Sequence, residues 1–316
     1  IRPMVTKNYD GGDLVLGTSG LVLSPKEFPH LTGLKGRTLL TSDGTTILGA
    51  DDKAGIAEIL TMIERIQTEN RPHGTICVAF TPDEEIGMGA EHFNLDQFGA
   101  EYAYTLDGDS EGEIQYENFN ACKAEFEIRG FNVHPGEGKD TMINASLVAI
   151  EINNCLPSME TPRGTEDYEG FYHLISMQGE VGEAKLNYIV RDHDKNGFEE
   201  RKKTLRLIEK NLNAKWGEGT VTLKITDQYL NMKEIVEEHM HLIDHAKKAC
   251  EAAGVAPLIL PIRGGTDGCQ LSFKGLPCPN LGTGGHAFHG PYEHISVEGM
   301  EKSVELLLAL IQEYTK

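Results

Sequence analysis

The chain has 316 residues, of which 39% are hydrophobic and 25% charged, and its 49 acidic against 29 basic residues give a formal net charge of −20. Such a length exceeds what a single hydrophobic core usually organises, so we expect about two domains. The excess of negative charge argues against nucleic acid and anionic membranes as partners, and it suits the binding of cations.

The cysteines and the lack of long apolar runs indicate where the protein works. The six cysteines form no Cys-x-x-Cys pair, as is common in a reducing compartment. No apolar run approaches the length of a bilayer-spanning helix, and no signal segment is visible. We therefore expect a cytoplasmic location and no membrane partner. Because the chain begins with Ile1 in a turn-rich stretch, we also expect an N-terminal portion to be absent.

The chain starts with a turn-rich segment that contains a few apolar residues. Residues 1–36 are rich in Gly and Pro, which predicts a covering loop with short strands. Residues 37–41 and 45–48 flank an Asp-Gly turn, so a β-hairpin is expected there.

An acidic pair stands where the chain is expected to enter a helix. Asp51 and Asp52 precede apolar residues that recur at helical spacing from Ile56 to Ile66. An acid at the positive end of a helix dipole is commonly a simple cap. Asp52 and Lys53 stand directly beside Asp51. A simple helix cap therefore explains this cluster of charges less completely.

Acids also follow two apolar stretches further along the chain. Residues 75–80 are predicted to form a buried strand that leads to Glu84 and Glu85, and another predicted strand ends at Asp107. Solvated acidic turns do occur at strand ends. However, the carboxyl ends of neighbouring parallel strands share one edge of a sheet. Three acidic ends, of which Asp51 is the first, therefore favour a metal site.

The pattern changes near residue 117. Alternating polar and apolar residues first predict a strand with one wet face, and the elements that follow continue the order strand, helix, two strands, helix, strand. These segments are 123–128, 144–156, 172–191 with a break at Gly182, 198–212 and 220–226. This is the order of a ferredoxin-like α+β sandwich. We therefore predict a domain at 117–230 that is inserted into an α/β domain formed by 1–116 and 231–316.

The remainder of the chain returns to an α/β pattern with two glycine-rich loops. Helices are expected over 233–253 and 297–314, and a strand over 258–262. Glycines in the loops around Arg263 and His289 let the backbone approach a ligand closely. A histidine in such a loop is more often simply exposed. It becomes a candidate metal ligand only if acidic residues from elsewhere in the chain lie near it.

Several short motifs, in this order along the chain, resemble those of one family. They are Ala50-Asp51-Asp52-Lys53-Ala54-Gly55, Pro82-Asp83-Glu84-Glu85-Ile86-Gly87, Thr105-Leu106-Asp107-Gly108, Asn132-Val133-His134-Pro135-Gly136, Arg263-Gly264-Gly265-Thr266-Asp267-Gly268 and His289-Gly290. The chain is similar to the peptidase T family of tripeptide aminopeptidases, within the two-zinc superfamily of aminoacylases and carboxypeptidases, and the phrase Tyr168–His173 narrows the likeness to that family. The resemblance implies a zinc-peptidase catalytic domain, with a mixed sheet between helices, at 1–116 and 231–316. The inserted domain would be a ferredoxin-like lid through which a homodimer forms.

The resemblance assigns the acids to a two-zinc centre. Asp51 would bridge two ions, and Glu85 and His289 would bind one of them. Asp107 would bind the other ion. Glu84 would be the general base that takes a proton from water and passes it to the leaving amine. The family also tends to have a cis peptide directly after the bridging acid.

The resemblance also assigns contacts to the substrate. His134 would stabilise the oxyanion of the tetrahedral intermediate, although a polar residue in a Pro-Gly turn needs no such function. Arg263 would bind the carboxylate of the peptide, because its planar fork pairs with a carboxylate through two bonds. Arg191 and Asn231 are weaker candidates for the same carboxylate.

One part of the family pattern is absent from this chain. Family members carry an early His-x-Asp motif, and none lies upstream of Asp51. His30 and His73 have neither the spacing nor the strand context to replace it. Loss of a ligand and of the acid that orients it weakens a metal site strongly, so this chain alone is expected to hold one zinc or none.

The sequence therefore predicts an aminopeptidase that releases the N-terminal residue of tripeptides and uses two zinc ions in the complete enzyme. Two alternatives remain open. One is an aminoacylase-like or carboxypeptidase-like amide hydrolase of the same superfamily. The other is a non-catalytic fragment, which the absent His-x-Asp motif favours. The presence of Glu84 disfavours it, because a binding module needs no general base.

Overall fold

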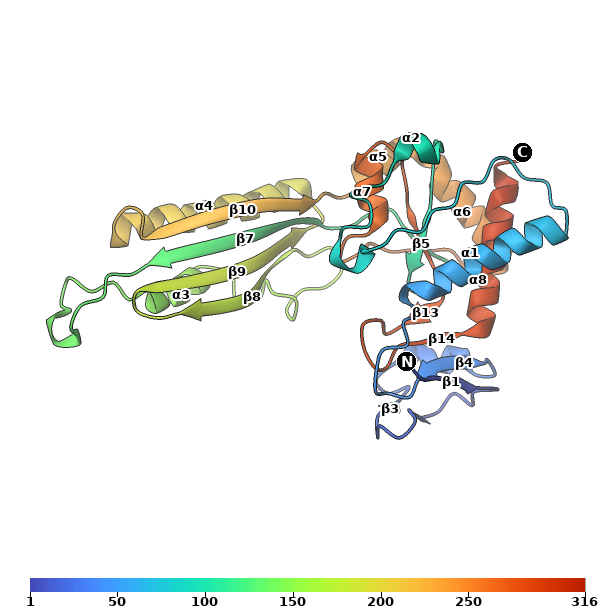
Figure 1. The fold of residues 1–316 in the computed structure, drawn as a ribbon, viewed down its shortest axis with the longest axis horizontal. Helices are drawn as coiled ribbons and strands as arrows, with labels where there is room; N and C mark the ends of the chain where they lie inside the picture. Colours follow the sequence, from blue (N-terminus) through green and yellow to red (C-terminus); the bar gives the residue numbers. More distant parts are fainter. Residues whose placement is uncertain (316) are drawn as a thin grey trace. The chain divides into compact units, whose positions relative to one another are not determined.

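The chain forms two units in the computed structural model, which describes residues 1–315. Unit 1 consists of Ile1–Tyr116, Met232–Leu260 and the residues from Thr266 on, and unit 2 consists of Glu117–Asn231 and Pro261–Gly265. The loop that contains Arg263 therefore belongs to unit 2, although unit 1 supplies the sequence on both sides of it. Figure 1 labels the elements of both units.

In the described part of unit 1, four strands precede helix α1 along the chain and six follow it. Its strands are β1 (Pro3–Thr6), β2 (Leu14–Val15), β3 (Val22–Leu23), β4 (Leu39–Ser42), β5 (Thr105–Gly108), β6 (Glu113–Gln115), β11 (Leu258–Ile259), β12 (Asn280–Gly282), β13 (Gly285–His286) and β14 (His294–Ser296). Its helices are η1 (Pro29–Leu34), α1 (Ala50–Thr68), η2 (Glu84–Ile86), α2 (Leu95–Phe98), α5 (Lys233–Val236), η4 (Glu237–His239), α6 (His241–Ala252), α7 (Asp267–Phe273) and α8 (Val297–Glu313). Among residues 1–315, no helix combines the length and the apolar composition needed to cross a membrane.

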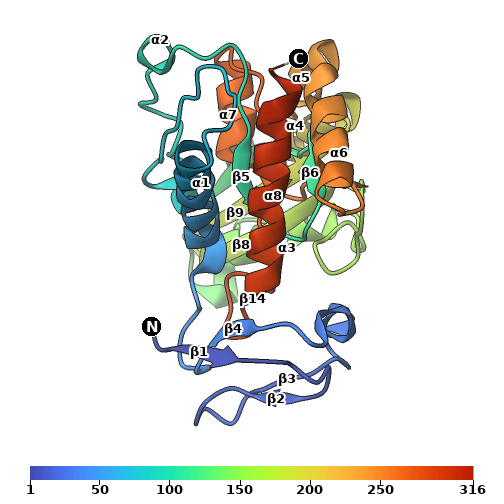
Figure 2. The same ribbon diagram turned by 90° about the vertical axis from the view of Figure 1, so that its right-hand side faces the viewer.

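A mixed sheet forms the centre of unit 1. Its strand order is β11-β6-β12-β5, in which β12 runs parallel to β5 and antiparallel to β6. Helix α8 packs between α1 and α6 (Figure 2) and buries Val304, Leu307 and Leu308. The predicted α/β class, with a mixed sheet and packed helices, is confirmed.

A second sheet of unit 1 ties the first residues of the chain to its last strands. Its order is β1-β4-β14-β13, and a small core with Leu31 and Leu39 fully buried lies in the N-terminal segment. The hairpin predicted around the Asp-Gly turn is wrong, because both edges of β4 are occupied by β1 and β14. The side chains of Ser42 and Asp43 shape the turn instead: Ser42 Oγ donates to Thr46 O at 2.7 Å, and Asp43 Oδ1 accepts from Thr45 N at 3.0 Å.

The strand predicted over residues 75–80 is also wrong. This segment has no regular structure, and Ile76, Val78 and Phe80 are 36%, 38% and 50% exposed. An apolar run becomes a buried strand only where another strand satisfies its backbone groups, and no described strand pairs with this segment. The acids that follow it therefore reach their position through the turn η2.

Unit 2 is an antiparallel sheet with two long helices. Its elements are β7 (Asn120–Arg129), η3 (Pro135–Glu137), α3 (Ala145–Asn154), β8 (Phe171–Gly179), β9 (Glu183–Asp192), α4 (Lys195–Trp216) and β10 (Val221–Tyr229). The strand order β10-β7-β9-β8 and the chain order strand, helix, two strands, helix, strand are those of the ferredoxin-like fold. Phe126, Leu186, Val148 and Leu205 are buried in its core. The predicted ferredoxin-like domain is confirmed.

Gly55 sets how closely α1 approaches β5. A Cβ on this residue would overlap the backbone oxygen of Leu106, the residue before Asp107. Because α1 begins at Ala50, this close approach brings the start of the helix to the strand that carries Asp107. The absence of a side chain at Gly55 therefore helps to bring the acids of α1 and β5 together.

We expect Gly55→Ala to lower the free energy of unfolding by about 1–3 kcal/mol, because the added methyl group pushes α1 away from β5. Chemical denaturation followed by circular dichroism measures the change. Gly33→Ala is the matched control, since no described atom outside its chain neighbours and the backbone of its own helix η1 lies within 4 Å of a Cβ at Gly33. Unchanged stability of Gly55→Ala would contradict the close packing of α1 on β5.

Candidate functional site

The start of α1 is bent, and the bend positions Asp51. The backbone of Asp51 and Asp52 departs from helical geometry, and the peptide bond between them is cis. Glu293, only 1% exposed, holds this bend. Its Oε1 accepts a hydrogen bond from Asp51 N at 3.0 Å, and its Oε2 accepts one from Gly49 N at 2.6 Å. The sequence prediction missed Glu293, for which the available signal is an acid shortly after His289 in the same loop.

Three predicted ligands converge at the end of this bend. His289 Nε2 lies 2.9 Å from Asp51 Oδ2 and 3.2 Å from Glu85 Oε2. One ring nitrogen carries at most one hydrogen, so it cannot donate to both carboxylates along straight bonds. The three ligand atoms lie within 4.8 Å of one another, which is the spacing of atoms that share a cation. This donor set of two carboxylates and an imidazole suits zinc or a similar divalent ion.

A second group of ligand atoms shares Asp51 with the first. Oxygen atoms of Asp51, Asp52 and Asp107 also lie within 4.8 Å of one another. Asp107 comes from β5, so helix α1 and the central sheet both contribute. The sequence prediction gave Asp52 no ligand role, whereas the structure places its carboxylate beside the predicted ligand Asp107. Asp52 Oδ1 also accepts a hydrogen bond from Gly55 N at 3.3 Å, which caps the helix.

Burial and neighbouring charges raise the pKa of two acids of the site, Asp52 and Asp107. Burial, followed by the charges of Asp51, Glu84 and Glu85, raises the pKa of Asp52 to about 8. Burial and the charges of Asp52, Glu84 and Asp51 raise the pKa of Asp107 to about 9. Without a cation, this cluster is therefore costly to ionise. Divalent cations would remove that cost, so the residues present fit the metal centre that the family resemblance implies.

The loops of the site contain residues in the left-handed backbone region. Asp83 has φ +63°, Ala287 has φ +56° and His289 has φ +60°. For residues other than glycine this conformation costs about 1–2 kcal/mol. Such strain persists only where contacts with the surrounding structure hold the backbone in place, and it is concentrated at functional sites. Both loops that contain the predicted ligands Glu85 and His289 have residues in this conformation.

In unit 2, the side chain of His134 is exposed, whereas that of Asn231 is buried and hydrogen-bonded. His134 is exposed at the start of η3, and its Nδ1 accepts a hydrogen bond from Gly136 N at 3.2 Å. Asn231 is 6% exposed, its Oδ1 accepts from Asn118 N at 3.0 Å and its Nδ2 donates to His193 O at 3.1 Å. The structure thus engages both ends of the Asn231 amide within unit 2.

Arg263 and Arg191 are also engaged within unit 2. Arg263 Nη1 donates to Asp167 O at 2.6 Å and Glu169 O at 3.2 Å, and its Nη2 donates to Thr165 Oγ1 at 3.0 Å. Arg191 Nη1 donates to Arg263 O at 3.0 Å. The predicted carboxylate-binding fork therefore holds the loop before β8, in which the family phrase Tyr168–His173 begins.

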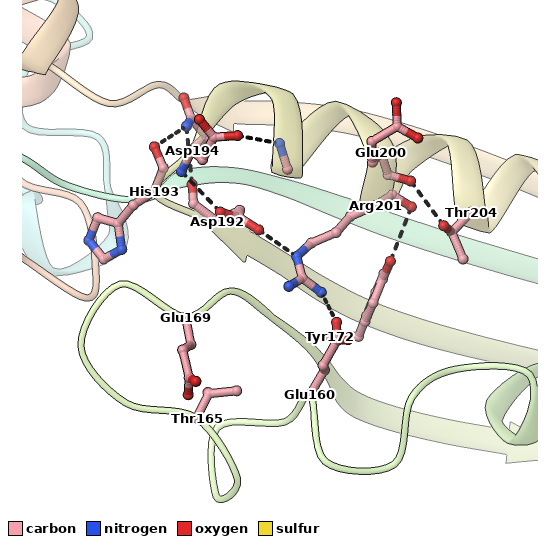
Figure 3. A network of polar contacts seen from close by, with 12 residues as sticks. Glu160, Thr165, Glu169, Tyr172, Asp192, His193, Asp194, Glu200, Arg201 and Thr204 are labelled. Atoms are coloured by element: carbon pink, nitrogen blue, oxygen red, sulfur yellow. Dashed lines mark hydrogen bonds and ion pairs between the residues drawn. The ribbon is translucent and has the colours of Figure 1, made fainter.

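A second arginine fixes the same loop from the other side. Figure 3 shows Arg201 between two acids: its Nε donates to Asp192 Oδ2 at 2.7 Å, and its Nη1 forms an ion pair with Glu160. The guanidinium also lies over the ring of Tyr172, at 5.0 Å from the centroid. The loop is therefore fastened by charged contacts at both of its ends, through Arg201 at Glu160 and through Arg263 near Glu169.

The two other histidines considered from the sequence make contacts of their own. His30 Nε2 lies 2.9 Å from His294 Nε2, and its ring stacks on that of His286 at 4.1 Å between centroids. His73 is exposed, with its Nδ1 at 2.7 Å from Gly74 O. Neither histidine belongs to a ligand group among the described residues.

Known proteins similar to this chain agree on one family. The sequence profile of peptidase family M20/M25/M40 matches residues 44–313. A protein of Clostridium perfringens named peptidase T is 55% identical over 317 residues, which cover 100% of this chain and 78% of that protein. A peptidase T of Halothermothrix orenii is 53% identical over 316 residues, which cover 99% of this chain and 78% of that protein.

A solved structure gives the same result. The crystal structure of aminopeptidase PepT from Bacillus cereus matches with a TM-score of 0.77 and 28% sequence identity, over 88% of this chain and 74% of that one. The similarity thus extends over sequence and fold together. The chain belongs to peptidase family M20/M25/M40.

Proposed function

We propose that this chain is a zinc-dependent aminopeptidase that removes the N-terminal residue from tripeptides. The observation that carries the proposal is the convergence of ligand atoms from Asp51, Glu85 and His289, with Asp107 in an adjoining group. Carboxylates joined by an imidazole are a donor set of catalytic zinc sites. The relatives named peptidase T support the tripeptide as substrate.

The ligand groups divide naturally between two ions. Asp51 belongs to both groups and would be shared, with Glu85 and His289 on one ion. Asp107 would hold the other, and Asp52 is close enough to add a further oxygen. Bound zinc supplies a Lewis acid that polarises the scissile carbonyl and lowers the pKa of water.

We assign the transfer of the proton to Glu84. It is half-buried on η2, directly before the ligand Glu85. Burial and the charges of Asp267, Glu85 and Asp51 raise its pKa to about 7. A carboxylate with a pKa near neutrality takes a proton from the attacking water and can release it again to the leaving amine.

We assign two residues of unit 2 to the substrate. Because His134 Nδ1 accepts a hydrogen bond from Gly136, the neutral ring carries its hydrogen on Nε2, which is the donor that an oxyanion requires. Arg263 would bind the peptide carboxylate in exchange for its contacts with Asp167, Glu169 and Thr165 of the loop before β8. Arg191 would support the backbone of Arg263. The bonds around Asn231 favour a structural role for that residue.

Unit 2 also has a surface that supports a homodimer. Strand β8 lies at the edge of its sheet, and its Ile175 and Met177 are 52% and 41% exposed. An exposed apolar edge strand offers unpaired backbone groups to a second copy. We propose that the enzyme pairs through this edge.

The function is tested with zinc, unsubstituted protein and three substrates: tri-alanine, tetra-alanine and N-acetyl-alanine. We expect release of free alanine from tri-alanine alone, because the enzyme needs both a free amino group and a nearby carboxylate. Chromatography of the released amino acids gives the rates. Comparable hydrolysis of N-acetyl-alanine would indicate an aminoacylase instead. Failure to cleave any substrate, together with failure to bind zinc, would indicate a non-catalytic protein.

Glu84→Gln is expected to lower kcat by about 100- to 10,000-fold, because the amide cannot accept the proton of the attacking water. The melting temperature should stay the same, since the two side chains have the same shape. Steady-state kinetics with tri-alanine measures the effect. Glu91→Gln, an exposed acid in the same loop, is the matched control and should keep full activity. Activity of Glu84→Gln near that of the control would exclude Glu84 as the base.

The raised pKa values predict how stability depends on pH without metal. Asp52 and Asp107 have pKa values of about 8 and about 9 in the folded protein, whereas an unfolded chain has values of about 4. Between these limits the folded protein binds more protons than the unfolded chain, so its free energy of unfolding falls as the pH rises. Zinc binds the ionised carboxylates. It should therefore raise the melting temperature more at about pH 8 than at about pH 5.5.

Differential scanning fluorimetry in EDTA and in zinc, at both pH values, measures this dependence. Asp51→Asn is the informative variant, since it removes the carboxylate shared by both ligand groups. It should lose most of the zinc effect at the higher pH. An equal gain in melting temperature at both pH values would contradict the coupling between the acids and the metal.

Arg263→Lys separates a carboxylate-binding role from a loop-holding role. Lysine keeps the positive charge but lacks the planar guanidinium that pairs with a carboxylate through two hydrogen bonds. We therefore expect the KM for tri-alanine to rise about 10- to 100-fold. The KM for tri-alanine amide, which has no carboxylate, should stay the same. Steady-state kinetics on both substrates decides between the roles, because a mere loosening of the loop would affect both substrates equally.

A further inference from the structure

Three histidine side chains of unit 1 form a cluster that contains no member of the two ligand groups. They are His30 in η1, His286 in β13 and His294 in β14. His30 Nε2 lies 2.9 Å from His294 Nε2, with an angle of 6° between the ring planes. The His30 ring also stacks on that of His286, at 4.1 Å between centroids. His30 therefore contacts both strands of the hairpin that β13 and β14 form.

The hydrogen bonds of this cluster run in one direction. His294 Nδ1 lies 2.7 Å from Tyr292 O, and a carbonyl oxygen can only accept, so the neutral ring of His294 carries its hydrogen on Nδ1. Its Nε2 is then an acceptor, and the hydrogen between the two rings belongs to His30. Burial lowers the pKa of His294 to about 4, which keeps the ring neutral at neutral pH. His30 is thus the donor to a fully buried ring that cannot reach solvent.

The hairpin encloses the loop that contains the proposed ligand His289. Strands β13 and β14, labelled in Figure 1, pair antiparallel with His286 opposite His294, and residues 287–293 form the loop between them. Glu293, which accepts from Asp51 N, directly precedes His294, and His289 follows His286 by three residues. A shift of either strand would therefore move a group of the proposed metal centre.

The backbone alone gives this hairpin little support. The pairing of β13 with β14 extends over two residue pairs, and Ala287 and His289 in the loop have the left-handed backbone conformation. So short a hairpin, with strained residues in its loop, needs side-chain contacts to hold one conformation. His30 supplies them from a segment far away in the sequence, and Phe28 adds a ring contact with Tyr292 at 5.4 Å between centroids.

We propose that His30 is a positioning residue for the metal centre. Its hydrogen bond to His294 holds the base of the loop 287–293 and thereby the proposed ligand His289. This inference rests on the proposed function, because it gives His30 a part in zinc binding. His30 itself is exposed, so its replacement opens no cavity in a core. Its effect should therefore appear in the affinity for zinc and not as a loss of the fold.

The first measurement is the affinity of the full chain for zinc, by competition with a chelating dye. His30→Phe keeps a ring that stacks on His286 but leaves Nε2 of the buried His294 without a donor. We expect the dissociation constant for zinc to rise about 3- to 10-fold, which is less than for a group that contacts a ligand directly. The melting temperature in EDTA should fall by no more than about 4 °C, so the protein stays folded during the titration.

A conservative variant and a control separate the hydrogen bond from other effects of the substitution. His30→Gln has an amide N–H that can donate to His294 Nε2, so it should restore most of the affinity. His73→Phe is the same exchange at an exposed histidine outside the cluster, and it should bind zinc as the unsubstituted protein does. Equal dissociation constants for His30→Phe and the control, or no recovery in His30→Gln, would overturn the proposal.

Hydrogen exchange in EDTA, followed by mass spectrometry, tests the hold on the loop without metal. A peptide that covers residues 287–293 should exchange faster in His30→Phe than in the control, because the loop opens more often once the contact is lost. Unchanged exchange would count against His30 whatever the affinity for zinc. The proposed function fails separately, if the unsubstituted protein binds no zinc and cleaves no tripeptide.

Discussion

The hydrogen bonds between the Glu293 carboxylate and the backbone at the start of α1 are the constraint on which the site depends. Glu293 accepts from Gly49 N and Asp51 N, and thereby fixes the direction of the Asp51 side chain. The same loop carries His289, which contacts Asp51 Oδ2. One loop near the end of the chain thus supplies the proposed ligand His289 and also orients the proposed ligand Asp51. Any displacement of this loop would misplace both ligands together.

The negative charge of the site is the second determinant, and it acts against stability. Burial raises the pKa of Asp52, Asp107 and Glu84, and the charges of neighbouring acids raise it further. A protein without a cationic ligand has no use for such an arrangement, because pairing or exposing the acids would stabilise it more. The arrangement is reasonable if cations supply the missing attraction, which makes metal binding and folding parts of one equilibrium.

How much the sequence predicts depends on how local the determining contacts are. The ferredoxin-like order of unit 2 follows from alternation and helical spacing within each segment, so it was predictable. The strand at 75–80 was not, because an apolar run needs a partner strand and its own residues cannot specify one. The acids Glu84 and Glu85 still reach the site, since the turn after this segment, and not a strand end, positions them.

The site residues that the sequence did not reveal share a physical reason. Glu293 and Asp52 are acids whose importance lies in what surrounds them: two backbone N–H groups for the first and neighbouring carboxylates for the second. In the sequence each is an acid beside a more recognisable motif residue, and spacing alone cannot distinguish it from a solvated acid. Burial decides between these cases, and burial depends on segments far apart in the chain.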